Sequence, residues 1–243
     1  MLGFSVGKCM AFGTIYWVFD SLFGNRISSA EMGKGIAVML YLIRHEETPL
    51  NAAGRNRGTD DPPLSPKGRQ DAASTGRMLA GKVDRIVADS PKRTQETAKI
   101  ISGGKPIETD ARLKTLDIGQ YSGKKASPAA DKEFDTKYID HPERKIPGGE
   151  SVNQWLPKWK ATYKDYLQQS KHENIALVTH GRPVSSAVHG FTTDSLKEKN
   201  VPKLGCCVFQ VGNDGVPKQM KAPKVVNSNP AAPAMKLSQL ARA

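Results

Sequence analysis

Residues 36–45 read IAVMLYLIRH, an unbroken apolar run that ends in an arginine and a histidine. A short apolar run rich in β-favouring residues is typical of a strand buried on both faces of a parallel sheet. Arg44 and His45 therefore stand at the carboxyl end of a predicted strand. Because open α/β sheets bind ligands at the carboxyl ends of their strands, this stretch indicates both the fold class and the position of the site.

Further strands and helices follow this strand in alternation. Three more strands are predicted, at residues 83–88, 174–179 and 206–211. Helices are predicted at about 65–79, 90–101, 151–169 and 181–190. Ser65 is the predicted N-cap of the first helix, because a serine hydroxyl can accept a hydrogen bond from the first turn. The alternation predicts a three-layer α/β sandwich with a mostly parallel central sheet flanked by helices.

The chain divides into one predicted domain and two appendages. Its 243 residues suffice for one ordinary α/β domain, which we place at residues 39–216. Within it, residues 124–149 are polar and charged and are predicted to form a partly helical lid over the pocket. Residues 217–243 form a basic tail that is predicted to be disordered, and residues 1–38 form an N-terminal extension.

The N-terminal extension contains an apolar run, Cys9–Phe19, that is too short to cross a bilayer. It could be an export signal, although Asp20 interrupts that pattern. Residues 1–31 could instead form an anchor at a membrane surface, the one case in which membrane contact is expected. A third interpretation, a non-native extension before a start at Met32 or Met39, is favoured because the first strand begins almost immediately after Met39.

The composition indicates an anionic partner. The net charge is +12 and the sequence pI is about 9.6, which fits a small phosphorylated substrate or a phosphoprotein. No specific nucleic-acid binding is expected, because no basic motif is interleaved with aromatic residues.

The cysteines and the scattered histidines argue against disulfides and metals. Cys9, Cys206 and Cys207 give neither a disulfide framework nor a paired zinc-ligand spacing, so a reducing, cytoplasmic location is expected. Three histidines lie apart without companion ligands: His141, His172 and His189. No metal ion and no other cofactor is implied.

Basic side chains recur where predicted strands end or the next helix begins. They are Arg44 with His45, Arg93 and His180. Arginine suits phosphate because its planar fork donates two hydrogen bonds and keeps its proton, and the amino termini of the following helices add backbone donors. A neutral imidazole can attack phosphorus, so a histidine among these donors is a candidate nucleophile. Scattered surface cations would not all fall at these junctions, and the pattern therefore predicts a phosphate pocket.

Several blocks of residues carry a resemblance to a known family. They are Leu42, Ile43, Arg44, His45, Glu47, Thr48 and Asn51; Gly54, Arg55, Gly58, Asp61, Pro63, Leu64 and Ser65; Ser90, Pro91, Arg93, Thr97 and Ala98; Gly119 and Gly123; Gly149, Glu150 and Ser151; and Thr179, His180 and Gly181. In these blocks the chain resembles the histidine phosphatases, also called the phosphoglycerate mutase-like superfamily. An isolated Arg-His pair carries no information, but this order and spacing form a specific signal over residues 39–211.

The resemblance implies a phosphomonoester hydrolase that works through a phosphohistidine intermediate. It implies that His45 is transiently phosphorylated and that Arg44, Arg93 and His180 bind the phosphoryl group. The residues expected to contribute to substrate binding are Asn51, Arg55, Thr48 and Gly181.

Two positions depart from the family pattern. Glu46 stands where the family usually has glycine, and its carboxylate is expected to point away from a pocket that accepts an anion. The family's common proton-donor glutamate aligns with Thr115. Asp117, two residues before Gly119, is therefore predicted to be the general acid, with Glu150 as the next candidate. The alternative for Asp117, a turn-stabilising aspartate, stays open.

Two alternatives to hydrolysis follow from the same residues. A phosphoglycerate mutase-type phosphotransferase is less favoured, because the long insertion typical of those mutases is abbreviated between Gly123 and Gly149. A non-catalytic phosphate-binding or scaffold protein would retain the pocket but, given Glu46 and Thr115, turn over negligibly.

Removal of residues 1–38 is predicted to leave phosphatase activity intact, because the strand that presents His45 begins after them. The measurement compares the turnover and the thermal unfolding of the truncated and full-length proteins. Loss of folding or activity would mean that the extension packs on the domain. Recovery of the full-length protein in a membrane fraction would favour the anchor interpretation.

Overall fold

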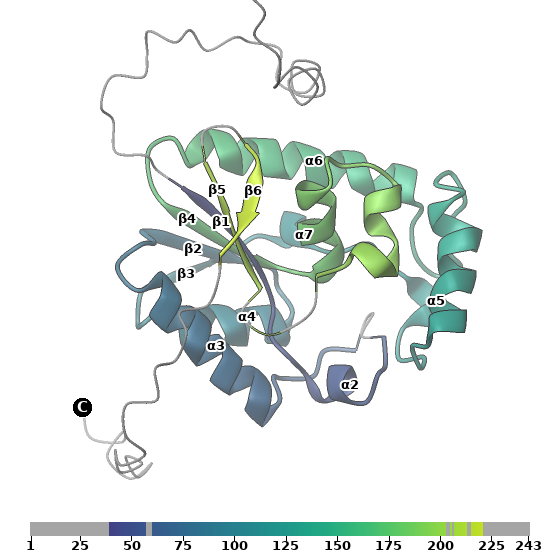
Figure 1. Ribbon diagram of the computed structural model, residues 1–243, viewed down its shortest axis with the longest axis horizontal. Coiled ribbons are helices and arrows are strands. Elements are labelled where there is room, and N and C mark those ends of the chain that lie inside the picture. Colours follow the sequence, from purple (N-terminus) through teal and green to yellow (C-terminus); the bar gives the residue numbers. More distant parts are fainter. Residues whose placement is uncertain (1–38, 57–59, 203–204, 206, 213–214, 221–243) are drawn as a thin grey trace, which may run out of the picture. The chain divides into compact units, whose positions relative to one another are not determined.

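The computed structural model describes residues 39–56, 60–202, 205, 207–212 and 215–220 (Figure 1). The predicted extension at 1–38 lies outside these residues, as does residue 221 onward of the predicted tail. Among the helices of these described ranges, none combines the length and apolar character that a membrane crossing requires.

One sheet of six strands forms the centre of the domain (Figure 1). Its strands are β1 Leu40–Arg44, β2 Arg85–Ala88, β3 Ile107–Thr109, β4 Ile175–Thr179, β5 Val208–Val211 and β6 Pro217–Gln219. Their order across the sheet is β3-β2-β4-β1-β5-β6. The first four of these pair in parallel, whereas β5 is antiparallel to both of its neighbours. The predicted α/β architecture is confirmed, with a mixed sheet whose larger part is parallel.

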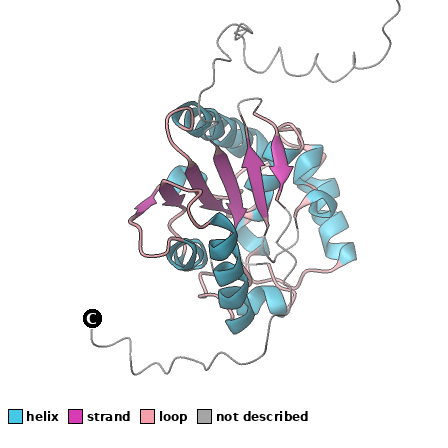
Figure 2. Ribbon diagram, turned by 60° about the vertical axis from the view of Figure 1, so that its left-hand side comes forward, coloured by secondary structure: helices cyan, strands magenta, loops and turns pink. Residues whose placement is uncertain are grey.

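Helices cover both faces of the sheet, as Figure 2 shows. Tyr41 and Ile43 of β1 pack in one apolar cluster with side chains of α3 (Pro66–Leu79) and α4 (Lys92–Ile101). Leu40 and Leu42, which alternate with them, pack in a second cluster with α6 (Val152–Gln169) and α7 (Gly181–Val188). Because successive strand residues point to opposite faces, these two clusters establish the three layers.

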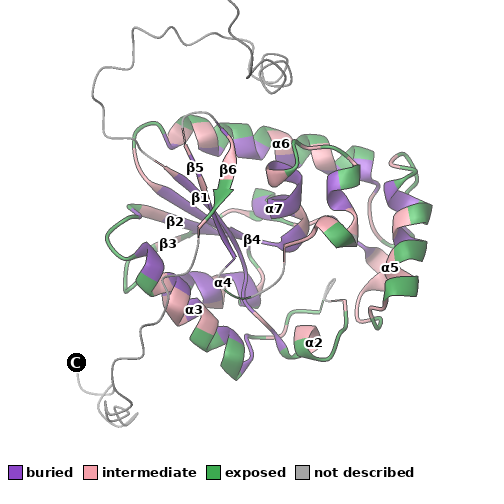
Figure 3. Ribbon diagram, in the orientation of Figure 1, coloured by how far each residue is buried: buried purple, intermediate pink, exposed green. Residues whose placement is uncertain are grey.

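The central strands and the long helix supply the core (Figure 3). All five residues of β1 and all five of β4 are buried, which explains their continuous apolar sequences. The aromatic side chains of α6, assigned to packing from their spacing, are at most 3% exposed: Trp155, Trp159, Tyr163 and Tyr166. Each indole nitrogen finds an acceptor; that of Trp159 donates to the carbonyl of Pro183 at 3.0 Å.

Helix ends follow the predicted capping chemistry. Ser65 caps α3, because its hydroxyl accepts from the N–H of Gly68 at 3.0 Å. At the start of α6, Ser151 and Gln154 form a reciprocal capping box. The predicted insertion is partly helical, with α5 at Pro128–Phe134 and the π-helix η4 at Asp135–Ile139.

Several short elements were not predicted. They are the helix α2 Pro49–Ala52, the strand β3, and the 3-10 turns η2 Ala111–Leu113, η3 Gly119–Tyr121, η5 Asp194–Leu196 and η6 Glu198–Asn200. The predicted start of the tail at residue 217 is wrong, because Pro217–Gln219 form β6 and pair with β5. This pairing gives the strand its backbone hydrogen bonds, which composition alone does not reveal.

Candidate active site

Three neighbouring strands bring their carboxyl ends together at one edge of the sheet. β4 lies between β2 and β1, and backbone hydrogen bonds continue past the ends of the strands. The N–H of His45 donates to the carbonyl of Thr179 at 2.8 Å, and the N–H of Asp89 donates to the carbonyl of Val178 at 3.1 Å. His45, Asp89 and His180 therefore leave three adjacent strands at the same level.

The ring of His45 is fully buried and oriented by the backbone. Its Nδ1 lies 2.8 Å from the carbonyl oxygen of Glu46. A carbonyl can only accept, so Nδ1 carries a proton, and in the neutral ring Nε2 then has the lone pair. The rings of His45 and His180 meet edge to face, with centroids 5.3 Å apart and an interplanar angle of 67°.

Two buried arginines stand beside these rings. Arg44 is 6% exposed, and its guanidinium donates to the carbonyl of Pro202. Arg93, in the first turn of α4, donates to the carbonyl of Asp60 at 3.3 Å and pairs with the carboxylate of Asp61 at 3.5 Å. Burial lowers the pKa of the Arg93 guanidinium, and the nearby Asp61 and Asp89 carboxylates oppose that shift. Arginine stays charged after such a shift, so the pocket keeps its positive charge.

A buried carboxylate supports the second histidine. Asp89 follows β2, and its Oδ2 lies 2.7 Å from Nε2 of His180; both side chains are 4% exposed. Asp89 was missed in the sequence, although it has the position after a strand that singled out His180.

Backbone donors are present at one of the two helix ends predicted to supply them. α7 begins at Gly181, its N-cap His180 makes no side-chain cap hydrogen bond, and Gly181 and Arg182 both line the cavity beside the arginines, so the amino terminus of α7 stands at the wall of that cavity. At α4, in contrast, the N–H of Lys92 donates to both carboxylate oxygens of Asp61, at 2.7 and 3.0 Å. The N–H of Lys92 therefore binds the loop that contains Asp61.

The loop after β1 brings two of its three predicted binding residues to the pocket. Asn51 and Arg55 line it, and Arg55 also donates to the carbonyl of Gly123 at 3.0 Å. Thr48 is fully buried, and its N–H and hydroxyl both donate to Oδ1 of Asn51, at 3.1 and 3.0 Å. With its oxygen engaged, Asn51 has its amide NH₂ as the end that can donate to an anion.

The two candidate acids lie outside the residues that line the pocket. Asp117 is exposed, and its Oδ1 accepts from the N–H of Gly119 at 3.0 Å, the contact of a turn-stabilising aspartate. Oε1 of Glu150 accepts from the N–H of Asp117 at 3.3 Å and lies 4.0 Å from Nζ of Lys114, with which it forms an ion pair. Thr115 lines the pocket.

The carboxylate of Glu46 points away from the pocket, as expected. It is fully buried and accepts from the hydroxyl of Thr75 on α3 and from the N–H of Gly205, both at 3.1 Å. These partners stabilise a charge that burial would otherwise disfavour. Burial also raises the pKa of the nearby Cys207 thiol to about 12. That cysteine is therefore a packing residue and not a nucleophile.

Two adjoining cavities make up the site. The first, which we call the phosphate pocket after the prediction from the sequence, has a volume of about 180 Å³ and is lined by the arginines, His180 and Gly181 described above. A second cavity of about 360 Å³ lies beside α5 and shares three lining residues with it: Asn56, Ile118 and Arg182. Arg182, also missed in the sequence, stacks on the ring of Phe134 at 5.1 Å and so joins the insertion to the pocket.

A family model for the histidine phosphatase superfamily (branch 1) matches residues 40–216, which include every element of this site. The chain belongs to this superfamily.

The chain is also similar to individual proteins of known sequence or structure. The chain is 34% identical over 152 residues to the protein named "Probable phosphoglycerate mutase GpmB" of Enterobacter sp. (strain 638), covering 59% of this chain and 70% of that protein. The solved structure of Bacillus stearothermophilus YhfR is 28% identical, has a TM-score of 0.60, and covers 75% of this chain and 95% of its own. A phosphoserine phosphatase from Entamoeba histolytica in complex with 3-phosphoglyceric acid has the same fold, with a TM-score of 0.61 at 23% identity over 75% and 95% of the two chains.

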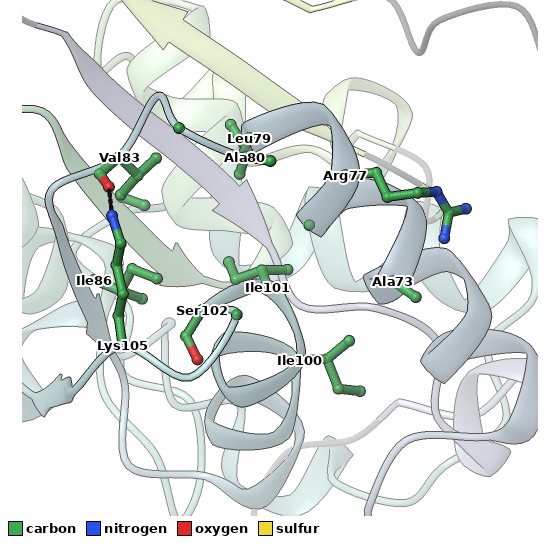
Figure 4. A pocket seen from close by; sticks show the side chains of 14 residues that line it. Ala73, Arg77, Leu79, Ala80, Val83, Ile86, Ile100, Ile101, Ser102 and Lys105 are labelled. Atoms are coloured by element: carbon green, nitrogen blue, oxygen red, sulfur yellow. Dashed lines mark hydrogen bonds between the residues drawn. The ribbon is translucent and has the colours of Figure 1, made fainter. Parts of the chain in front are cut away.

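A further cavity lies apart from this site. It has a volume of about 460 Å³ and lies between the carboxyl ends of α3 and α4 (Figure 4). Leu79, Val83, Ile86 and Ile101 line it, and the ammonium of Lys105 is engaged by the carbonyl of Val83. This apolar lining has no histidine or acid that could act on a phosphate.

Among the described residues, no cluster of three or more His, Cys, Asp or Glu side chains is arranged to hold a metal ion.

Gly181 allows the guanidinium of Arg44 to lie against the start of α7. A Cβ at this position would stand 2.5 Å from Cγ1 of Val201 and 3.3 Å from Cζ of Arg44. Gly181→Ala is therefore predicted to displace Arg44 and to weaken the binding of inorganic phosphate by about tenfold, the loss of roughly one charge-assisted hydrogen bond. Isothermal titration calorimetry measures this affinity.

The matched control for Gly181→Ala removes the nearer obstacle. Val201→Ala in the same chain frees the space around Cγ1, so the double variant is expected to recover part of the affinity. An unchanged affinity in Gly181→Ala alone would show that the close approach does not position Arg44.

Proposed function

We propose that this chain is a phosphomonoester hydrolase that works through a phosphohistidine intermediate on His45. The observation that carries the proposal is the edge-to-face contact between the rings of His45 and His180, with Arg44 and Arg93 lining the same cavity as His180. A nucleophile with a lone pair and a set of fixed cations are the two requirements of phosphoryl transfer.

In the first step, Nε2 of His45 forms a bond to phosphorus while the ester P–O bond breaks. The leaving oxygen takes a proton from a general acid and departs as an alcohol. In the second step, water attacks phosphorus, the P–N bond breaks and the proton of water returns to the conjugate base of that acid. Arg44, Arg93 and the amino terminus of α7 stabilise the charge on the three remaining oxygens in both steps.

Several residues support the nucleophile without reacting. The carbonyl of Glu46 holds the tautomer of His45, because it accepts from Nδ1. Asn51 donates its amide to the phosphoryl group, and Thr48 positions that amide through its two contacts with Oδ1. Arg55 lines the same wall and binds the outer oxygens of the substrate.

The substrate class proposed is a small phosphorylated molecule. The phosphate pocket opens beside a cavity of about 360 Å³ that contains lysines, aspartates and the ring of Tyr121. We place the alcohol portion of the substrate there, because Arg182 and Asn56 line both cavities. A phosphorylated side chain of a protein fits the same chemistry and is distinguished by assaying phosphate release from both kinds of substrate.

A phosphotransferase is the second candidate, favoured by the 34% identity to a protein named as a phosphoglycerate mutase. A mutase returns the phosphoryl group to a second hydroxyl and therefore shields phosphohistidine from water. Transfer without net release of phosphate, seen when a bisphosphorylated sugar or glycerate is supplied, would establish it.

A non-catalytic phosphate-binding protein is the alternative from a different class. One reason for it was a carboxylate at Glu46, and the contacts of that carboxylate with Thr75 and Gly205 remove the conflict with a bound anion. The other reason was Thr115, which stands where the family has its acid. The non-catalytic alternative therefore depends on whether another residue donates the proton to the leaving oxygen.

His45→Ala is predicted to abolish turnover and the phosphoenzyme together. Brief exposure of the wild-type protein to labelled substrate should give an acid-labile, base-stable phosphoenzyme, whereas the variant should give none. Arg93→Ala should retain the phosphoenzyme but lose about a hundredfold or more in rate, since one fixed charge is missing from the transition state. Unchanged turnover in His45→Ala would overturn the assignment.

Asp117 is proposed as the general acid, although its present contact is with Gly119. A positioned acid contributes about a hundredfold to ten-thousandfold when the leaving group is an alkoxide. Asp117→Asn should therefore lose turnover of an alkyl phosphate far more than turnover of an aryl phosphate. Glu150→Gln is the matched comparison, and equal losses on both substrates in Asp117→Asn would assign that residue to the turn.

A further inference from the structure

Asp89 and His180 form a buried pair behind the phosphate pocket. The carboxylate Oδ2 lies 2.7 Å from Nε2 of the ring, and each side chain is 4% exposed. The other carboxylate oxygen of Asp89 accepts from the N–H of Ser90 at 2.8 Å. Since the carboxylate cannot donate, Nε2 of His180 carries a proton and donates a hydrogen bond to Oδ2 of Asp89.

This contact has a consequence for Nδ1, the other nitrogen of the ring. With a proton on Nε2, a neutral imidazole has a lone pair on Nδ1, and that lone pair would repel a phosphoryl oxygen. Only the imidazolium donates from both nitrogens. A carboxylate within hydrogen-bond distance stabilises the imidazolium, most strongly where water is excluded. His180 can therefore donate to a phosphoryl group from Nδ1 only while the ring is charged, and Asp89 extends the charged state to higher pH.

The position of His180 assigns it to the sides of the phosphoryl group and not to the leaving oxygen. The nucleophile and the leaving oxygen stand on opposite sides of phosphorus in an in-line displacement. The ring of His180 lies 5.3 Å from that of His45, beside the nucleophile. It therefore faces the three oxygens that stay on phosphorus, which it shares with Arg44 and Arg93.

We infer that Asp89 is a positioning residue that holds His180 as an imidazolium, so that His180 donates from Nδ1 to the phosphoryl oxygens throughout the transfer. This inference rests on the proposed function. Among the described residues, the charged and titratable groups that border His180 are Arg44 at the end of β1, His45 after β1, Asp89 after β2, Arg93 on α4, Arg182 on α7 and, through Arg93, Asp61 of the loop. Asp89 is the carboxylate in this set that contacts the ring.

The test replaces Asp89 with asparagine, which keeps the shape and removes the charge. Asp89→Asn is expected to lose about tenfold to a hundredfold in kcat/KM, by analogy with the carboxylates that orient metal-binding histidines. The loss should be the same for an alkyl and an aryl phosphate, because His180 does not protonate the leaving oxygen. Asp84→Asn is the matched control, since Asp84 precedes the same strand at its opposite end and hydrogen-bonds to Asn174.

The pH dependence of kcat/KM shows whether Asp89 acts through its charge or only through its shape. In the wild-type protein, Asp89 keeps His180 protonated as the pH rises. In Asp89→Asn the ring loses its proton at lower pH, so the alkaline limb of kcat/KM should move to lower pH. The defect should be largest in alkaline solution and smallest in acid, where the ring is protonated in both proteins.

A double-mutant cycle shows whether Asp89 acts through His180. In a His180→Gln background the ring is absent, so Asp89→Asn should cost no further activity. An equal cost in both backgrounds would overturn the inference, as would an alkaline limb that does not move. A loss confined to the alkyl phosphate would also overturn it, because the pair would then supply the leaving-group proton.

Failure of the inference and failure of the proposed function give different results. If the wild-type protein forms no phosphoenzyme and releases no phosphate from any monoester, the proposed function fails. If it does both while Asp89→Asn behaves like Asp84→Asn, only the inference fails. The thermal unfolding temperature of each variant identifies any that has lost its fold.

Discussion

The parallel pairing of β1 with β4 is the constraint on which the site depends. Its register sets Arg44 opposite Thr179, and the next N–H, that of His45, donates to the carbonyl of Thr179 at 2.8 Å. The two histidines thus leave neighbouring strands at one level, and their rings meet. Because side chains alternate between the faces of a sheet, a shift of one residue in this register would turn one histidine away from the other.

Much of the fold could be predicted because its decisive strands are buried on both faces. Complete burial of β1 and β4 requires continuous apolar sequences, and these are visible without any alignment. Ile107–Thr109 and Pro217–Gln219 carry no such signal, because each strand has three residues that are exposed or only partly buried. They become strands through pairing with β2 and β5, a long-range contribution that local sequence does not contain.

The site was predictable where function coincides with a strand end, and not where it depends on contacts across the chain. Arg44, His45 and His180 have that position, and the structure brings them together. Asp89 has it too, but an aspartate before Ser90 and Pro91 is typical of a turn. Its partner His180 lies 91 positions away. Asp117 is the opposite case. Its spacing from Gly119 fitted both a general acid and a turn-stabilising aspartate, and in the structure its carboxylate accepts from the N–H of Gly119.

The arrangement of acids around the pocket explains how a cluster of cations persists before any anion is bound. Arginines and an imidazolium held side by side in a buried site repel one another. Asp61 lies 3.5 Å from Arg93, and Asp89 lies 2.7 Å from His180, so each carboxylate offsets part of that repulsion from behind the cation. Neither is among the residues that line the phosphate pocket. The donors therefore stay oriented toward an incoming phosphoryl group, and little reorganisation remains for the reaction itself.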